Sequence, residues 1–128
     1  MKRTTLVIFF ILIFTQCDFT YTYWSKGDYA VWNNSSPDGL TLYNINGNGG
    51  HGRVSDILEI GSNEKFIIVK SHNYYDELKF EYWILDISKD NYHLNSDEIM
   101  MGPFTLEIFK LEKKKLGIET LKFEKSFK

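Results

Sequence analysis

The chain has 128 residues, enough for one globular domain, and a net charge of −2 at pH 7. Aromatic residues make up 16% of it, a composition that argues against disorder and suits the half-buried surfaces of β-sheets. The slightly acidic balance gives no electrostatic basis for nucleic-acid binding, and a single cysteine excludes an internal disulfide.

The first part of the chain has the pattern of an export signal. Lys2 and Arg3 precede nine consecutive apolar residues, LVIFFILIF, at positions 6–14. A helix needs about 20 residues to cross a bilayer, whereas a secretory signal has a basic start and an apolar core of about 7–15 residues. We therefore predict a signal peptide over residues 1–17, a tether or edge strand over residues 18–27, and a single domain over residues 28–128.

The only cysteine, Cys17, stands where this signal would end, in the sequence FTQC. This sequence resembles the lipobox of bacterial lipoproteins, in which the cysteine becomes the lipid-modified first residue of the mature protein. It departs from the lipobox at Gln16, where glycine, alanine or serine is usual, and at Phe14, where leucine is usual. The resemblance implies lipidation of Cys17 and attachment to a membrane through that lipid. Soluble release after cleavage and an uncleaved anchor are the alternatives.

Short apolar runs separated by turn-forming clusters predict a series of strands. Residues 34–39 (NSSPDG), 46–52 (NGNGGHG) and 61–64 (GSNE) are the clusters that divide the first four. The longest candidate alternates between two faces and ends at the turn-forming Asp86. The predicted strands are residues 29–33 (YAVWN), 40–45 (LTLYNI), 53–60 (RVSDILEI), 65–70 (KFIIVK), 78–87 (LKFEYWILDI) and 118–123 (IETLKF).

One helix is predicted near the C-terminus, between Thr105 and Gly117. Thr105 suits the N-cap, and Glu107 lies in the first turn, where negative charge complements the helix dipole. Three lysines at 113–115 fill the last turn, and Gly117 suits the position after the helix. The predicted apolar stripe consists of Leu106, Phe109 and Leu116.

Together these elements predict an α+β fold. We expect an antiparallel meander sheet of about five or six strands, with the one C-terminal helix packed on it, preceded by the signal segment.

No motif for catalysis or metal binding is present, so we predict no catalytic residue, no metal and no cofactor. The three histidines are predicted in exposed loops, and their spacing matches no metal-binding pattern. The glycine-rich residues 47–52 precede a strand pattern rather than a helix, which favours a hairpin tip over a phosphate loop. Neighbouring serines and acids do not imply convergence in space. The candidates considered are His51, His72, His93, Ser55-Asp56, Ser71-His72, Ser96-Asp97, Asp76, Asp86 and Asp90.

Aromatic and basic residues offer a different kind of site. Trp24, Trp32 and Trp83 are predicted mainly as core and sheet-face residues, and Trp24 is the one most expected to be exposed. The lysines of residues 110–115 are predicted to form a solvated helix face rather than a lipid-binding one.

Three segments resemble a family of small uncharacterised bacterial secreted and lipoprotein-like proteins: YWILD (82–86), GPF (102–104) and FKLEKKKLGI (109–118). That family shares a Tyr-Trp-Ile-Ile-Asp strand, then Gly-Pro-Leu, then a charged helix ending in Leu-Gly-Ile. The present chain departs from it in a longer connection over residues 87–101. The resemblance implies an exported location and a fold but no activity. The matching positions are Tyr82, Trp83, Ile84, Leu85, Asp86, Gly102, Pro103, Phe104, Phe109, Leu116, Gly117 and Ile118.

We therefore predict a small bacterial envelope lipoprotein, exported and membrane-anchored through Cys17. It is expected to be non-enzymatic and to act as a binding, accessory or immunity-type protein, with a protein partner and without nucleic acid. A soluble secreted or periplasmic domain that binds a ligand through exposed aromatics is the alternative, and an enzyme with an unrecognised site is the third hypothesis.

Overall fold

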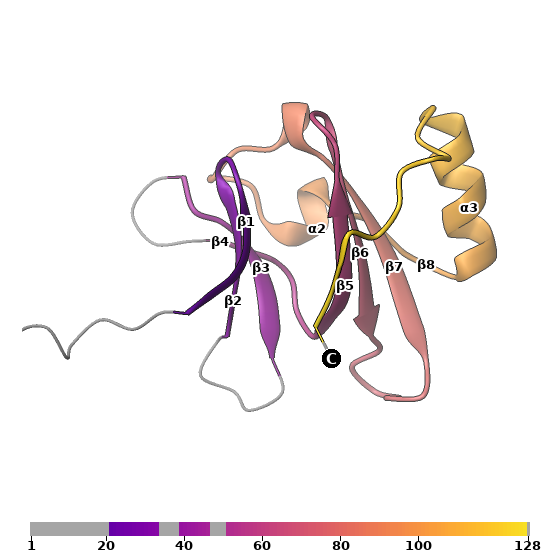
Figure 1. Cartoon of the computed structure of the whole chain (residues 1–128), viewed down its shortest axis with the longest axis horizontal. Coiled ribbons are helices and arrows are strands. Elements are labelled where there is room, and N and C mark those ends of the chain that lie inside the picture. Colours follow the sequence, from indigo (N-terminus) through magenta and orange to yellow (C-terminus); the bar gives the residue numbers. More distant parts are fainter. Residues whose placement is uncertain (1–20, 34–38, 47–50, 128) are drawn as a thin grey trace, which may run out of the picture.

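The computed structural model describes residues 21–33, 39–46 and 51–127, which are mostly β-structure (Figure 1). In this part of the chain the strands form two antiparallel sheets. The first sheet contains, in hydrogen-bonded order, β1 (Thr22–Lys26), β2 (Tyr29–Asn33), β3 (Leu40–Asn44) and β4 (His51–Val54). The second contains, in order, β8 (Met101–Phe104), β7 (Phe80–Asp86), β6 (Phe66–His72), β5 (Ile57–Ser62) and β9 (Lys125–Ser126).

The second sheet is buried on both faces around its central strand, β6. Ile67, Ile68 and Val69 are each fully buried. Successive side chains of a strand point to opposite faces, so this continuous apolar run requires cover on both sides. The first sheet covers one face, and helix α3 (Leu106–Lys115) covers the other (Figure 1).

Two apolar cores result from this layering. The first lies between the sheets and contains Tyr29, Val31, Leu42, Val54, Ile57, Ile60, Ile67, Val69, Leu85 and Met100. The second lies between the second sheet and α3 and contains Phe66, Ile68, Tyr82, Ile84, Phe109 and Ile118.

The predicted α+β fold with one meander sheet is wrong, because the chain changes sheet within a predicted strand. Residues 53–60 divide into β4 in the first sheet and β5 in the second. Asp56, between them, has φ 56°, a left-handed conformation that breaks an extended strand and that aspartate tolerates better than most residues. The alternating pattern therefore continues through a turn that joins two sheets.

The predicted strand at residues 118–123 is also wrong. Its backbone forms a turn, in which the Leu121 amide donates to the Ile118 carbonyl at 3.0 Å, followed by an irregular segment. Ile118 is buried in the second core, and Leu121 and Phe123 pack against it. The apolar pattern of this segment thus reflects burial against α3 and the sheet. Pairing with β5 begins only at β9, through Lys125 and Ser126.

The predicted helix is confirmed. Thr105 is the N-cap of α3, and its Oγ1 accepts a hydrogen bond from the Ile108 amide at 3.3 Å. Gly117 follows the helix with φ 72°, which a residue without a Cβ adopts at low cost. Of the predicted apolar stripe, Phe109 is buried and Leu106 is 44% exposed.

The connection over residues 87–101 contains a 3₁₀ turn (Ile87–Lys89) and a one-turn helix, α2 (Ser96–Ile99), before β8 begins. Within the described ranges, none of the helices has both the length and the apolar character that crossing a membrane requires.

Candidate functional site

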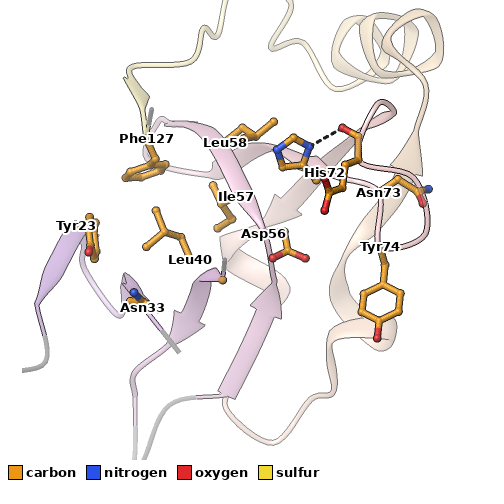
Figure 2. Close-up of a pocket in the computed structure, with 12 residues that line it drawn as sticks. Tyr23, Asn33, Leu40, Asp56, Ile57, Leu58, His72, Asn73, Tyr74 and Phe127 are labelled. Carbon is orange, nitrogen blue, oxygen red and sulfur yellow. Dashed lines mark hydrogen bonds between the residues drawn. The ribbon is translucent and has the colours of Figure 1, made fainter. Parts of the chain in front are cut away.

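A groove of about 620 Å³ lies where one end of the first sheet meets the second (Figure 2). The first sheet supplies one wall from β1, β2 and β3. The second supplies the other from β5, the end of β6 and the turn before β7, and the chain after β9 closes one side. The described lining residues are Tyr23, Asn33, Gly39, Leu40, Asp56, Ile57, Leu58, His72, Asn73, Tyr74, Glu77 and Phe127.

One end of the groove is apolar. Figure 2 shows Tyr23 and Leu40 facing Ile57 and Phe127 across it. The rings of Tyr23 and Phe127 lie edge to face, with centroids 6.4 Å apart and an interplanar angle of 81°. Such rings offer both apolar area and the negatively charged faces that attract cations.

The other end is polar and includes Asp56, His72 and Glu77. His72 Nδ1 lies 3.1 Å from the carbonyl oxygen of Glu77. A carbonyl can only accept, so Nδ1 is the donor in this contact. Within the described part of the chain, the carboxylates of Asp56 and Glu77 take part in no side-chain hydrogen bond or ion pair.

The turn between β6 and β7 fixes the rim of the groove. Asn73 Oδ1 accepts hydrogen bonds from the Tyr75 and Asp76 amides at 2.8 and 3.1 Å, and Asp76 Oδ1 accepts from the Leu78 amide at 3.0 Å. Asparagine and aspartate favour such turns because their side chains replace backbone acceptors. The turn holds three large side chains in solvent: Tyr74, Tyr75 and Leu78 are 82%, 92% and 89% exposed.

These three residues, which we call the aromatic ridge, adjoin the groove through Tyr74. The rings of Tyr74 and Tyr75 pack edge to face with centroids 5.0 Å apart. Scattered exposed apolar residues need no explanation, but several large ones on a single well-fixed turn beside a groove are typical of an interaction surface.

The charge of the groove is negative. Among the described lining residues, Asp56 and Glu77 are acidic and none is lysine or arginine. A basic side chain, Lys125, contacts the apolar end from outside the lining, with its Nζ 5.9 Å from the Phe127 ring centroid. The groove therefore does not suit an anionic ligand.

A second polar cluster lies in the protein interior and ties the first sheet to residues 87–101. The side chains of Arg53 and Asp90 are fully buried and form an ion pair, with Nη2 and Oδ1 2.8 Å apart. Asp90 Oδ2 also accepts hydrogen bonds from the Tyr29 hydroxyl at 2.7 Å, Arg53 Nε at 3.0 Å and Asn44 Nδ2 at 3.2 Å. Arg53 donates further to the carbonyls of Asn91 and Leu94 at 3.0 and 2.9 Å.

This buried cluster shifts the pKa values of its members. Burial alone would raise the pKa of Asp90, but hydrogen bonds from Arg53 and Tyr29 and the charge of Arg53 outweigh it, so the pKa lies below its ordinary value. Burial, together with the hydrogen bond to Asp90, raises the pKa of Tyr29 far above its usual range. Every polar group has a partner, which indicates a structural role for the cluster.

The sequence candidates are distributed across the molecule. Cys17 and the glycines at 47–50 lie outside the described residues. His51 and His72 lie in strands, not in the predicted loops, and only His72 reaches the groove. His93 is exposed, as predicted. Within the described ranges, no three His, Cys, Asp or Glu side chains are placed to hold a metal ion.

The candidate serines, Ser55, Ser71 and Ser96, occupy structural positions. Ser71 is buried, and its Oγ accepts a hydrogen bond from Trp83 Nε1 at 2.9 Å. Thr41 Oγ1 donates to Ser55 Oγ at 3.4 Å, and Ser96 begins α2. Asp86 accepts from the Ser88 amide at 3.0 Å, which confirms its predicted role in the following turn.

The predictions for the aromatic and basic residues hold in part. Trp24 is partly buried against the first core, so the prediction that it is the exposed tryptophan is wrong. Three of the helix lysines are exposed, but Lys113 Nζ donates to the Leu121 carbonyl at 2.6 Å and helps to fix the segment after the helix. Burial and the nearby charge of Lys110 lower the pKa of Lys113.

Comparison with known proteins identifies a family but no activity. A family model described as "Protein of unknown function (DUF3997)" matches residues 26–127. The chain belongs to this family. The expected membership of an uncharacterised family is therefore confirmed, over more of the chain than the last third that the motifs covered. No curated protein and no solved structure matches the chain.

The DUF3997 match covers the structural features described above. It includes every lining residue of the groove except Tyr23, the whole aromatic ridge and all members of the Arg53–Asp90 cluster. It begins after the predicted signal segment. The family description contains no function.

Proposed function

We propose that this DUF3997 protein is a lipid-anchored, non-enzymatic binding protein of the bacterial cell envelope, and that the groove is its binding site. The observation that supports it most is the groove itself. It is a cavity of about 620 Å³ that combines aromatic walls, an exposed aromatic ridge at its rim and two carboxylates, and these carboxylates have no side-chain partner among the described residues. Binding sites typically combine apolar walls with a few convergent polar groups.

The location follows from the sequence of the first seventeen residues. Lys2 and Arg3, the short apolar run and Cys17 together have the pattern of a lipoprotein signal. Lipid on Cys17 would attach the domain to a membrane.

A binding role is favoured over an enzymatic one by what the candidate catalytic groups do. Ser71 is buried and accepts a hydrogen bond from Trp83. The Asp90 carboxylate already accepts hydrogen bonds from Arg53, Tyr29 and Asn44. The described lining of the groove presents carboxylates, aromatic rings and His72, and among these residues there is no serine, threonine or cysteine to act as a nucleophile.

Two experiments test the two parts of this proposal. Metabolic labelling with palmitate should label the wild-type chain, and Cys17→Ser should abolish the label. Absence of label on the wild type would contradict the anchor and favour the alternative, a soluble secreted or periplasmic binding domain that uses the same groove.

The binding site is tested by photo-crosslinking in the envelope of the producing cell. A photoreactive phenylalanine analogue at Tyr74 should form a discrete adduct with the partner. The same analogue at Leu111, a residue of α3 that is 55% exposed, should form none. Equal adducts at both positions, or none at either, would contradict the groove as the binding site.

A further inference from the structure

We infer that the groove receives a lysine or arginine side chain presented by an exposed segment of a partner protein, with the aromatic ridge packing against the rest of that segment. This inference rests on the proposed function, because it names the ligand of the same site.

The charge of the groove is the first argument. Asp56 and Glu77 line its polar end and, within the described residues, neither has a side-chain partner in the protein. Asp56 is half-buried and Glu77 is exposed at the rim, and a half-buried carboxylate is most strongly satisfied by a charge-assisted hydrogen bond. The two carboxylates complement an N–H cation and oppose an anion.

The shape of the groove is the second argument. Its apolar end, lined by Tyr23, Leu40, Ile57 and Phe127, adjoins the end that contains Asp56 (Figure 2). Lysine and arginine have the same two parts, an aliphatic stem and a charged head. The stem would lie against the apolar wall while the head reaches the carboxylates. Aromatic faces near the path of the cation add a favourable cation–π contribution.

The aromatic ridge distinguishes a protein partner from a free small cation. Tyr74, Tyr75 and Leu78 are more than 80% exposed, and of the three Tyr74 alone lines the groove, so a small molecule held by the carboxylates would not cover Tyr75 and Leu78. Tyrosine is enriched at the energetic centres of protein interfaces, and arginine is enriched there with it. The hydrogen bonds of the turn hold the ridge in place before binding, which reduces the entropy lost on association.

The test uses the exported mature protein in the form in which the cell makes it. The probe is a fluorescein-labelled peptide, Gly-Ser-Leu-Lys-Leu-Ser-Gly, with Gln or Glu in place of Lys as matched peptides, and spermidine as a free cation. The groove variant is Asp56→Asn/Glu77→Gln, in which asparagine also tolerates the left-handed backbone of position 56. The control is Glu64→Gln/Glu119→Gln, which removes the same charge at exposed positions outside the groove.

We expect the Lys peptide to bind the wild type more tightly than the Gln and Glu peptides. The groove variant should lose at least about tenfold in affinity, because the loss of one charge-assisted hydrogen bond already weakens binding by about that factor, and the control should stay within about twofold. Circular dichroism and the urea midpoint establish that both variants fold. Tyr74→Ser/Tyr75→Ser should weaken the peptide but leave spermidine unaffected.

The outcomes separate this inference from the proposed function. Equal binding of the three peptides, or equal loss in both charge variants, would overturn the cationic ligand; an adduct at Tyr74 would then still support the groove as a site. Spermidine that binds more tightly than the Lys peptide, without dependence on the ridge, would overturn the protein partner. Failure of both the peptide and the crosslink would overturn inference and proposed function together.

Discussion

The carboxylate of Asp90 accepts four side-chain hydrogen bonds, two from Arg53 and one each from Tyr29 and Asn44. These donors lie on three strands of the first sheet, so one side chain holds β2, β3 and β4 against the connection that leads to β8. A buried ion pair is not by itself evidence of high stability, because desolvation opposes the attraction. Removing one partner, however, leaves the other charge buried and uncompensated.

Arg53→Met tests this point. It should lower the free energy of unfolding by about 3–5 kcal/mol, measured by urea denaturation. The control, Lys115→Met, removes an exposed ion pair with Glu112 whose N–O distance is 3.1 Å, and should cost less than about 1 kcal/mol. A similar small loss for both variants would contradict a central role for the buried pair.

The lowered pKa of Asp90 predicts acid sensitivity. A carboxyl whose folded pKa lies below the unfolded value of about 3.9 contributes stability that is complete above that value. This stability is lost as the pH falls through the folded pKa. Between pH 5 and pH 2 the unfolding free energy of the wild type should therefore fall more steeply than that of Asp90→Asn. Parallel curves would show that Asp90 does not titrate differently on unfolding.

Among the secondary-structure elements, the sequence predicted most accurately the helix α3, whose limits depend on local chemistry. The N-cap Thr105, the lysines of the last turn and Gly117 define α3 without tertiary information. The pairing of strands is not local. Residues 53–60 resemble one strand, and only the polar pair Ser55-Asp56 and the apolar pair Ile57-Leu58 in the middle interrupt the alternation. Nothing in the alternation shows that β5 leaves the sheet of β4.

The candidate site could not be predicted from the sequence, for a related reason. Tyr23, Asp56, Tyr74 and Phe127 are far apart in the chain, and no fixed spacing joins them. The available signals were weak: asparagine and aspartate at positions 73 and 76 predict a turn, and the apolar residues within that turn have no core to enter. Apolar residues within a predicted turn were the one sequence feature that indicated a binding surface.

The position of the C-terminal residues 122–127 depends on Gly61. A Cβ at this position in β5 would overlap the carbonyl oxygen of Lys122, which is backbone and cannot move independently. Gly61→Ala should therefore displace residues 122–127 and destabilise the protein by about 1–3 kcal/mol.

Gly52→Ala is the matched control for this strand glycine, because its new Cβ would make only ordinary contacts, 3.8 Å from Thr41 Cγ2. It should change stability by less than about 0.5 kcal/mol. Hydrogen exchange of the Glu124 and Phe127 amides, which donate to β5 at 2.9 Å, locates the effect. Unchanged protection there in Gly61→Ala would contradict it.

In the whole molecule, the first core joins the two sheets. Val31 and Leu42 from the first sheet pack in the same cluster as Ile60 and Ile67 from the second. Neither sheet can bury its apolar face without the other, so the described structure should unfold as one cooperative unit.

The tryptophans report on each sheet separately. Trp83→Phe leaves Trp24 and Trp32, both in the first sheet, whereas Trp24→Phe/Trp32→Phe leaves only Trp83 in the second. Within each variant, the urea transition followed by tryptophan fluorescence should coincide with the transition followed by far-ultraviolet circular dichroism. An early fluorescence transition in the Trp83→Phe variant would indicate that the first sheet unfolds independently.

The Arg53–Asp90 cluster also has an evolutionary consequence. In a DUF3997 sequence that replaces Asp90 by an apolar residue, the guanidinium of Arg53 would be buried without its carboxylate partner. The hydroxyl of Tyr29 and the amide of Asn44 would lose the same acceptor. Substitution at any of these four positions is tolerable only when the others change with it. Across the family the four should vary as a set, while the ridge tyrosines, which are more than 80% exposed, should vary with the partner that each member meets.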